Sequence, residues 1–279
     1  MPQILYPPAR AQTLGEVLNT GGQIFRRAFG SALPYGIIVA VCGDLANLRN
    51  LSLGLPLQSF NSTDPVWWAW YVAGNILALL FGSAMILRQK ALAAGEAGNV
   101  MAEMRQGAVL LSRLIACMAL STLAVSLALV PFILALPMTG LNLTNPASPI
   151  NPANLNLGML LLLIPLSLPA AWLSLGLFFA PPALIVKKLG PIEAMRVSFR
   201  LLRGNWWRTS VLSAVLVGVL LLAALVPIII LALFGVTDVA RASTLLVPLE
   251  LVSDAIVLPW CSALVLAMMG DLMVRQEQK

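Results

Sequence analysis

The chain has 279 residues, of which 59% are hydrophobic and only 10% are charged, and its net charge is +6. Soluble domains are roughly 45–50% apolar and about 25% charged, so this composition excludes an ordinary water-soluble core and predicts lipid as the solvent. The sequence contains no histidine, which removes the commonest general base and the commonest metal ligand.

The first dozen residues contain prolines and no sustained apolar segment, so no secretory signal peptide is expected there. We predict that residues 1–12 form a cytoplasmic tail. Thr13 and Glu16 then have the spacing of a helix-capping box, and apolar residues follow at helical spacing beside Arg26 and Arg27. This pattern predicts an amphipathic helix that lies in the membrane interface ahead of the first span.

Six apolar segments have the length and composition of membrane-spanning helices. They cover approximately residues 31–47, 65–87, 114–136, 157–186, 209–234 and 243–270. The first is short, and the fourth is interrupted by several prolines. The chain from 13 to 272 is therefore predicted to be one all-α polytopic membrane domain of six transmembrane helices, followed by a cytoplasmic tail at 273–279.

The connections between these spans alternate in composition. Those at 61–65 and 142–156 are rich in Asn, Pro and Ser, as turns are. Fifteen of the seventeen Lys and Arg residues lie on the other side, and only Arg49 and Arg241 lie with the turn-like connections. Because cytoplasmic loops are enriched in Lys and Arg, we expect a membrane protein with both termini in the cytoplasm.

The most basic connection, KKLGPIEAMRVSFRLLRGNWWR, covers residues 187–208. Gly190-Pro191 suits the start of a helix and Gly204-Asn205 suits a break, and the apolar and arginine side chains between them fall on neighbouring helical stripes. This layout predicts a helix in the membrane interface with its arginines at anionic lipid headgroups. The candidate headgroup-binding residues are Lys187, Lys188, Arg196, Arg200, Arg203, Trp206, Trp207 and Arg208, together with Arg26 and Arg27 of the first amphipathic segment.

Nucleic-acid binding is disfavoured for this segment, because spans tether it at both ends and a groove binder needs a free basic surface. Docking of a neighbouring protein, or of a second copy of the chain, stays open. Residues 97–111 also have apolar side chains at helical spacing. The sequence thus predicts about three cytoplasmic interfacial helices, one before each pair of spans, a layout that resembles three repeats of interfacial helix plus transmembrane hairpin.

The run EAMRVSFRLLRGNWWR (193–208), which follows a proline-interrupted span, resembles a pattern in a broad bacterial group of six-span membrane proteins. That group includes the membrane domain found beside glycerophosphodiester phosphodiesterase catalytic domains. The resemblance rests on Ala194, Ser198, Leu202, Arg203, Gly204, Trp206 and Arg208, and the segment 14–30 adds to it. It implies a fold and a location in the bacterial inner membrane. It implies no catalytic residues, because the hydrolase of that group is a separate soluble barrel that is not expected in this chain.

Three acidic residues fall inside the apolar spans: Asp44 in the first, and Glu250 and Asp254 in the sixth. Ionisable groups within spans are costly and are functional suspects. Glu250 and Asp254 are four residues apart, so they share a helix face. Two interpretations remain open, a cation or proton site in a transport path, or a structural role. In the structural role these acids would pair with Arg49, Arg241, Asn47 or Asn75.

Signatures of enzymes and of metal or cofactor sites are missing from the sequence. It has no phosphate-binding loop and no G-x-S-x-G, and its three cysteines lie far apart in apolar runs, as packing residues do. Asp271 and Arg275 are expected to form an exposed ion pair worth only tenths of a kcal/mol (~0.3). The sequence predicts a non-catalytic protein for transport or for lipid or small-molecule handling between hairpins. The alternative is a membrane scaffold or assembly partner.

Overall fold

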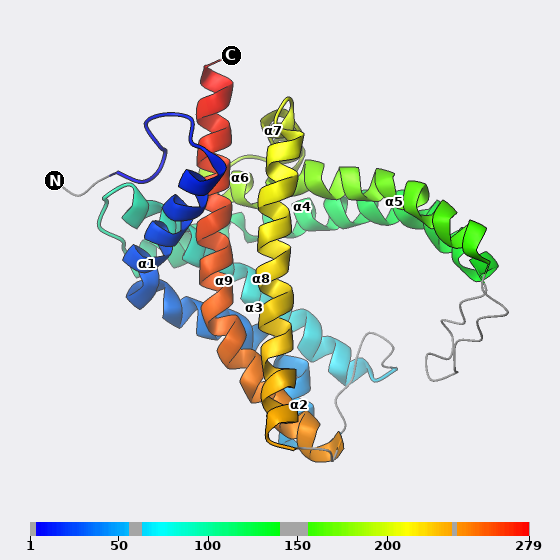
Figure 1. The fold of residues 1–279 in the computed structure, drawn as a ribbon. Helices are drawn as coiled ribbons and strands as arrows, with labels where there is room; N and C mark the ends of the chain where they lie inside the picture. The colour runs from blue at the N-terminus through cyan, green and yellow to red at the C-terminus, as the bar shows by residue number, and fades with distance from the viewer. Residues whose placement is uncertain (1–3, 56–62, 140–155, 236–238, 279) are drawn as a thin grey trace.

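The computed structural model describes residues 4–55, 63–139, 156–235 and 239–278, and the regular structure in these ranges is helical (Figure 1). Six helical segments are long and apolar enough to cross a membrane, which confirms the predicted all-α class and the six apolar helices. The predicted connection at 142–156 lies outside the described residues except for Asn156. In chain order the helices are α1 (Leu14–Gly43), α2 (Leu45–Ser52), α3 (Pro65–Ala93), α4 (Val100–Ala135), α5 (Leu157–Leu177), α6 (Ala180–Lys187), α7 (Pro191–Leu202), α8 (Trp206–Leu233) and α9 (Val239–Glu277), with a 3₁₀ turn at Leu136–Thr139.

Helix α1 lies at the centre of the bundle and packs along both α9 and α3. It approaches α9 closely at Gly36, where a Cβ atom would lie 2.5 Å from the carbonyl oxygen of Ala255 and 2.6 Å from the ring of Pro259. Pro259 has no N–H to offer that carbonyl, so α9 can bend there and α1 fits against the bend. A residue without a side chain at position 36 is therefore what allows the two helices to touch.

Two hairpins diverge from this centre. Helix α5 packs on α4 and α8 packs on α9, and in Figure 1 the α4–α5 pair extends to one side while α8 and α9 run together in another direction. In the apolar stretches of α4 and α8, which are long enough to cross a membrane, most side chains are exposed in the isolated chain. The two hairpins thus present separate apolar surfaces.

The structure corrects the prediction of three separate interfacial helices. Only the third amphipathic segment is a helix of its own, α7, which begins at Pro191 and ends before Gly204, whose φ of +81° few other residues adopt. The first two are continuous with spans, in α1 and α4, because no such break follows them. At 1.5 Å per residue the 36-residue α4 is about 54 Å long, well beyond a hydrocarbon core of about 30 Å, so one helix can hold both the amphipathic and the spanning part.

The fourth predicted span is divided into α5 and α6. Pro181 and Pro182 open α6 and lack the N–H groups that would continue the ladder from α5. The hydroxyl of Ser198 on α7 bridges the break, since it donates to the carbonyl of Gly176 at 2.6 Å and accepts from the N–H of Phe179 at 3.1 Å. The amphipathic helix α7 is therefore fastened to the interrupted span through a fully buried serine.

We expect Ser198→Ala to lower the free energy of unfolding by about 1–3 kcal/mol, because it leaves two buried backbone groups without a partner. Thermal unfolding in detergent micelles, followed by circular dichroism, measures the change. Ser167→Ala is the matched control, since the hydroxyl of Ser167 is exposed and bonds only the carbonyl of Ile164 in its own helix. Equal melting temperatures for the two variants would show that Ser198 does not hold the break.

The segment before α1 lies against the bundle, although the sequence predicted a tail. The N–H of Leu5 donates to the carbonyl of Ala93 at 2.7 Å, and Tyr6 is buried against Gly270 of α9. Burial raises the pKa of the Tyr6 phenol, which therefore stays neutral. At the other end of the chain, α9 continues through most of the predicted tail to Glu277. Residues 4–13 and the end of α9 thus lie together beside α7 and its arginines, which mark the basic end of the bundle (Figure 1).

Candidate functional site

The candidate headgroup-binding residues separate into two groups in the structure. Most are exposed around α7 and along the first half of α1. The exposed members are Lys187, Lys188, Arg196, Arg200, Arg203, Trp207, Arg26 and Arg27. Trp206 instead stacks on Trp172 of α5 with ring centroids 5.4 Å apart, and Arg208 turns inward.

Arg208 belongs to a buried ion-pair cluster centred on Asp271. The Asp271 carboxylate accepts hydrogen bonds from Nε of Arg208 and Nε of Arg275, both at 3.0 Å, and from the backbone N–H of Gln12 at 2.7 Å. Both guanidinium groups also donate to the carbonyl of Gln12. The prediction of an exposed Asp271–Arg275 pair is wrong, because Asp271 is only 1% exposed. The N-terminal segment covers it and α8 supplies a second arginine.

A second buried ion pair joins α1, α3 and α4. Glu103 is 7% exposed, lies 3.2 Å from Nη1 of Arg88, and accepts from the hydroxyl of Tyr35 at 3.2 Å. The sequence pattern does not mark these residues as partners. Glu103 lies in an amphipathic segment whose other charges are solvated, so only its contact with α1 and α3 distinguishes it.

A neutral polar contact links α3 to the bend in α9. Gln89 is fully buried, and its side-chain amide donates to the carbonyl of Pro259 at 2.7 Å while its oxygen accepts from the hydroxyl of Ser262 at 2.8 Å. Gln89 lies between Arg88 and Lys90, and this is the only signal in the sequence that could have marked it. The flanking charges suggest an aqueous position, whereas the structure places the amide against α9.

The three acids predicted as an intramembrane site lie in one region, at the opposite end from Asp271. Asp44 interacts electrostatically with both Glu250 and Asp254. Its carboxylate also accepts from the side-chain amide of Asn47 at 3.0 Å, as the structural interpretation predicted, whereas Arg49 lies 3.6 Å from Asp64.

Of the other predicted partners of these acids, only Asn75 has a side chain that the structure describes. Asn75 donates to the carbonyl of Tyr71 in its own helix, and the side chain of Arg241 lies outside the described residues. Within the described ranges, no three His, Cys, Asp or Glu side chains are arranged so that they could hold a metal ion, the three acids included. A role of the three acids in moving protons stays a prediction.

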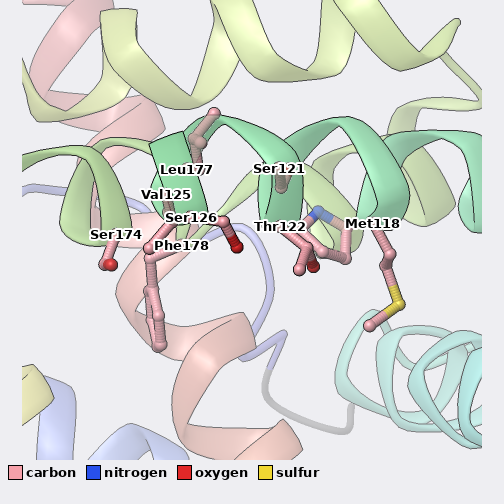
Figure 2. Close-up of a pocket in the computed structure, with 9 residues that line it drawn as sticks. Met118, Ser121, Thr122, Val125, Ser126, Ser174, Leu177 and Phe178 are labelled. Atoms are coloured by element: carbon pink, nitrogen blue, oxygen red, sulfur yellow. The ribbon is translucent and has the colours of Figure 1, made fainter. Parts of the chain in front are cut away.

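A cavity of about 340 Å³ lies where the α4–α5 hairpin leaves the bundle (Figure 2). Its lining is apolar apart from four hydroxyl groups, and it carries no charge. Figure 2 shows the hydroxyls of Thr122, Ser126 and Ser174 on one side of the α4–α5 pair. The lining residues are Met118, Ser121, Thr122, Val125 and Ser126 from α4, Ser174 and Leu177 from α5, and Phe178 and Pro181 at the break before and start of α6.

This cavity continues the core-facing side of α4. Leu110, Leu114 and Cys117 pack against α6 in the core, and Ser121 follows one turn beyond Cys117. From that point α5 is the main described neighbour of α4, and the hydroxyl-lined cavity lies where the core contacts with α6 end. A cavity with this lining can accept one uncharged hydrogen-bonding group attached to an apolar body.

Comparison with known proteins adds no relative to this picture. The chain matches no protein-family model, no curated protein and no solved structure.

Proposed function

We propose that this chain is a multi-pass protein of the bacterial inner membrane, with both termini in the cytoplasm, that binds a lipid or a similar small amphiphile between its hairpins. Its six long apolar helices support the membrane location, and the concentration of Lys and Arg at one end supports the orientation. The likeness of residues 193–208 to the six-span bacterial group is consistent with both. We propose no catalytic step.

The observation that carries this proposal is the hydroxyl-lined cavity beside α4. Ser121, Thr122, Ser126 and Ser174 contribute the polar part of a lining that is otherwise hydrocarbon. A hydroxyl that faces hydrocarbon is stabilised by a partner that donates or accepts a hydrogen bond. A charged ligand group would have no counterion among the lining residues, because none of them is charged. The ligand that fits is therefore an amphiphile whose buried polar part is neutral, such as an ester or an alcohol.

The test is binding of a diacylglycerol with a fluorescent acyl chain to the purified protein in detergent. We expect a variant with Ser121→Ala, Thr122→Val, Ser126→Ala and Ser174→Ala to bind the probe at least about tenfold more weakly, since a loss of 1.4 kcal/mol corresponds to a factor of ten. Thr122→Phe, which fills the cavity, should have the same effect without removing the other hydroxyls.

The matched control is Ser112→Ala with Ser167→Ala, which removes one hydroxyl from each of α4 and α5 outside the cavity. The control should bind within about twofold of the parent chain, well under 1 kcal/mol. Unchanged binding by the cavity-filling variant, with a monodisperse gel-filtration profile, would contradict the proposal.

A second function, as a membrane scaffold or assembly partner, is favoured by the surface of α7. Arg196 and Arg200 are exposed on this helix, and Trp207 just beyond it is 82% exposed. A basic helix with an aromatic at its end can hold anionic headgroups or the acidic surface of a neighbouring protein. The two functions use different parts of the molecule and do not exclude one another.

A further inference from the structure

We propose that the cavity between the first half of α4 and the α6–α7 connection binds one anionic phospholipid, with the phosphate held by Arg105, Arg113 and Lys188. This inference goes beyond the proposed function, because the cavity lies on a different side of α4 from the hydroxyl-lined one. It also names a charged ligand, whereas the hydroxyl-lined cavity suits a neutral one.

The cavity has a volume of about 570 Å³. It is lined by Asn99, Met101, Ala102, Arg105, Gln106, Val109, Leu110, Arg113 and Lys188. The α4 residues follow one another at intervals of three and four, so they form a single stripe along the helix. Lys188 reaches the stripe from the opposite wall, where its φ of +56° turns the chain at the end of α6.

Among the residues that the structure describes, the three cations in this cavity have no counterion. Arg105, Arg113 and Lys188 form no ion pair or hydrogen bond with another described side chain. By contrast, Arg88 and Arg208 are matched by the buried acids Glu103 and Asp271. Glu103 is the nearest acid on the same helix. Its carboxylate is buried toward α1 and α3, where it accepts hydrogen bonds from Tyr35 and Arg88.

Three unmatched positive charges around one cavity repel each other, and an anion that contacts all three removes that repulsion. Arg guanidinium groups bind phosphate oxygens through paired hydrogen bonds, and Lys adds a point charge. The charge pattern therefore fits a phosphate group.

The apolar part of the same stripe shows why the phosphate belongs to a lipid. Val109, which is 66% exposed, lies between the two arginines, and beyond Arg113 the stripe continues through Leu120, Leu123 and Leu127, all of them exposed. From Arg113 to Leu127 the helix advances about 21 Å, which exceeds the roughly 15 Å of one leaflet's hydrocarbon. An acyl chain attached to the phosphate can lie along this row, whereas a free phosphate gains nothing from it.

The experiment measures binding of phosphatidylglycerol and of phosphatidylcholine with the same acyl chains to the purified chain in neutral detergent, by native mass spectrometry. We expect the chain to retain phosphatidylglycerol preferentially. Arg105→Gln combined with Arg113→Gln should weaken phosphatidylglycerol binding at least about tenfold. Lys188→Asn should weaken it less, and Asn suits the left-handed backbone at that position.

The matched control is Arg196→Gln combined with Arg200→Gln, which removes the same charge from exposed positions on α7 outside the cavity. It should bind phosphatidylglycerol within about twofold of the parent chain. Val109→Trp fills the cavity and keeps every charge, so it should weaken binding as the arginine pair does.

Three results would overturn the site. The first is that the control loses as much phosphatidylglycerol binding as the Arg105, Arg113 variant, which would indicate that the lipid is held by the overall positive charge and not by this cavity. The second is full binding by Val109→Trp. The third is displacement of the lipid by glycerol phosphate at equal concentration, which would show that the apolar row contributes nothing. The variants of the hydroxyl-lined cavity should keep phosphatidylglycerol binding, so failure of the proposed function and failure of this site are told apart.

Discussion

Asp271→Ala is expected to lower the free energy of unfolding by about 3–5 kcal/mol, the range found when one partner of a buried ion pair is removed. Asp271 is 1% exposed and accepts three hydrogen bonds from two arginines and a backbone N–H. Its loss leaves both guanidinium groups facing one another without a negative charge. The measurement is chemical or thermal unfolding in a detergent that keeps the parent chain folded.

The variants of the two arginines should follow a graded order. Arg208→Gln and Arg275→Gln each leave one guanidinium on the Asp271 carboxylate, so each should cost less than Asp271→Ala. Glu277→Gln is the control, since this exposed acid ends the same helix. If Asp271→Ala unfolds like Glu277→Gln, the cluster does not hold the basic end together.

Gly36→Ala is expected to destabilise the chain by about 2–3 kcal/mol through overpacking. The added methyl group would lie 2.5 Å from the backbone oxygen of Ala255 and 2.6 Å from Pro259, and neither can turn aside as a flexible side chain could. Helices α1 and α9 must separate along the contact that forms the centre of the bundle. Unfolding followed by circular dichroism, at matched detergent concentration, measures the loss.

Gly22→Ala is the matched control for this prediction, because it lies on the same helix and its new methyl group would meet nothing within 4 Å. Alanine is the better helix former, so this variant should be unchanged or more stable by up to about 1 kcal/mol. If both variants lose a similar free energy of unfolding, the effect of alanine in α1 does not come from its contact with α9.

Local features of the chain were predictable because they depend on neighbours in sequence. The capping box at Thr13 and Glu16 is present, with the N–H of Glu16 donating to Thr13 and the N–H of Thr13 donating to Glu16. The limits of α7 also follow from local chemistry, since Pro191 begins it and Gly204 follows its end. Apolar length alone identified the six long helices.

Features that depend on distant partners were not predictable in this way. Asp271 has the spacing of an ordinary surface pair with Arg275, and only the arrival of Gln12 and Arg208 from elsewhere in the chain buries it. No sequence pattern marks Ser121 and Ser174. They line one cavity only because α4 and α5 lie side by side. Likewise, Arg105 and Lys188 become one site only because α6 ends opposite α4.

The bonds around Gln12 also order the assembly of the molecule in time. A ribosome makes residue 12 long before residues 208, 271 and 275, and the carbonyl and N–H of Gln12 bond to all three. The bonds of Gln12 are therefore complete only when the end of α9 has been translated. A nascent chain that stops short of Asp271 keeps the Arg208 partner of Gln12 and lacks the two from α9, so its amino-terminal segment is held less firmly.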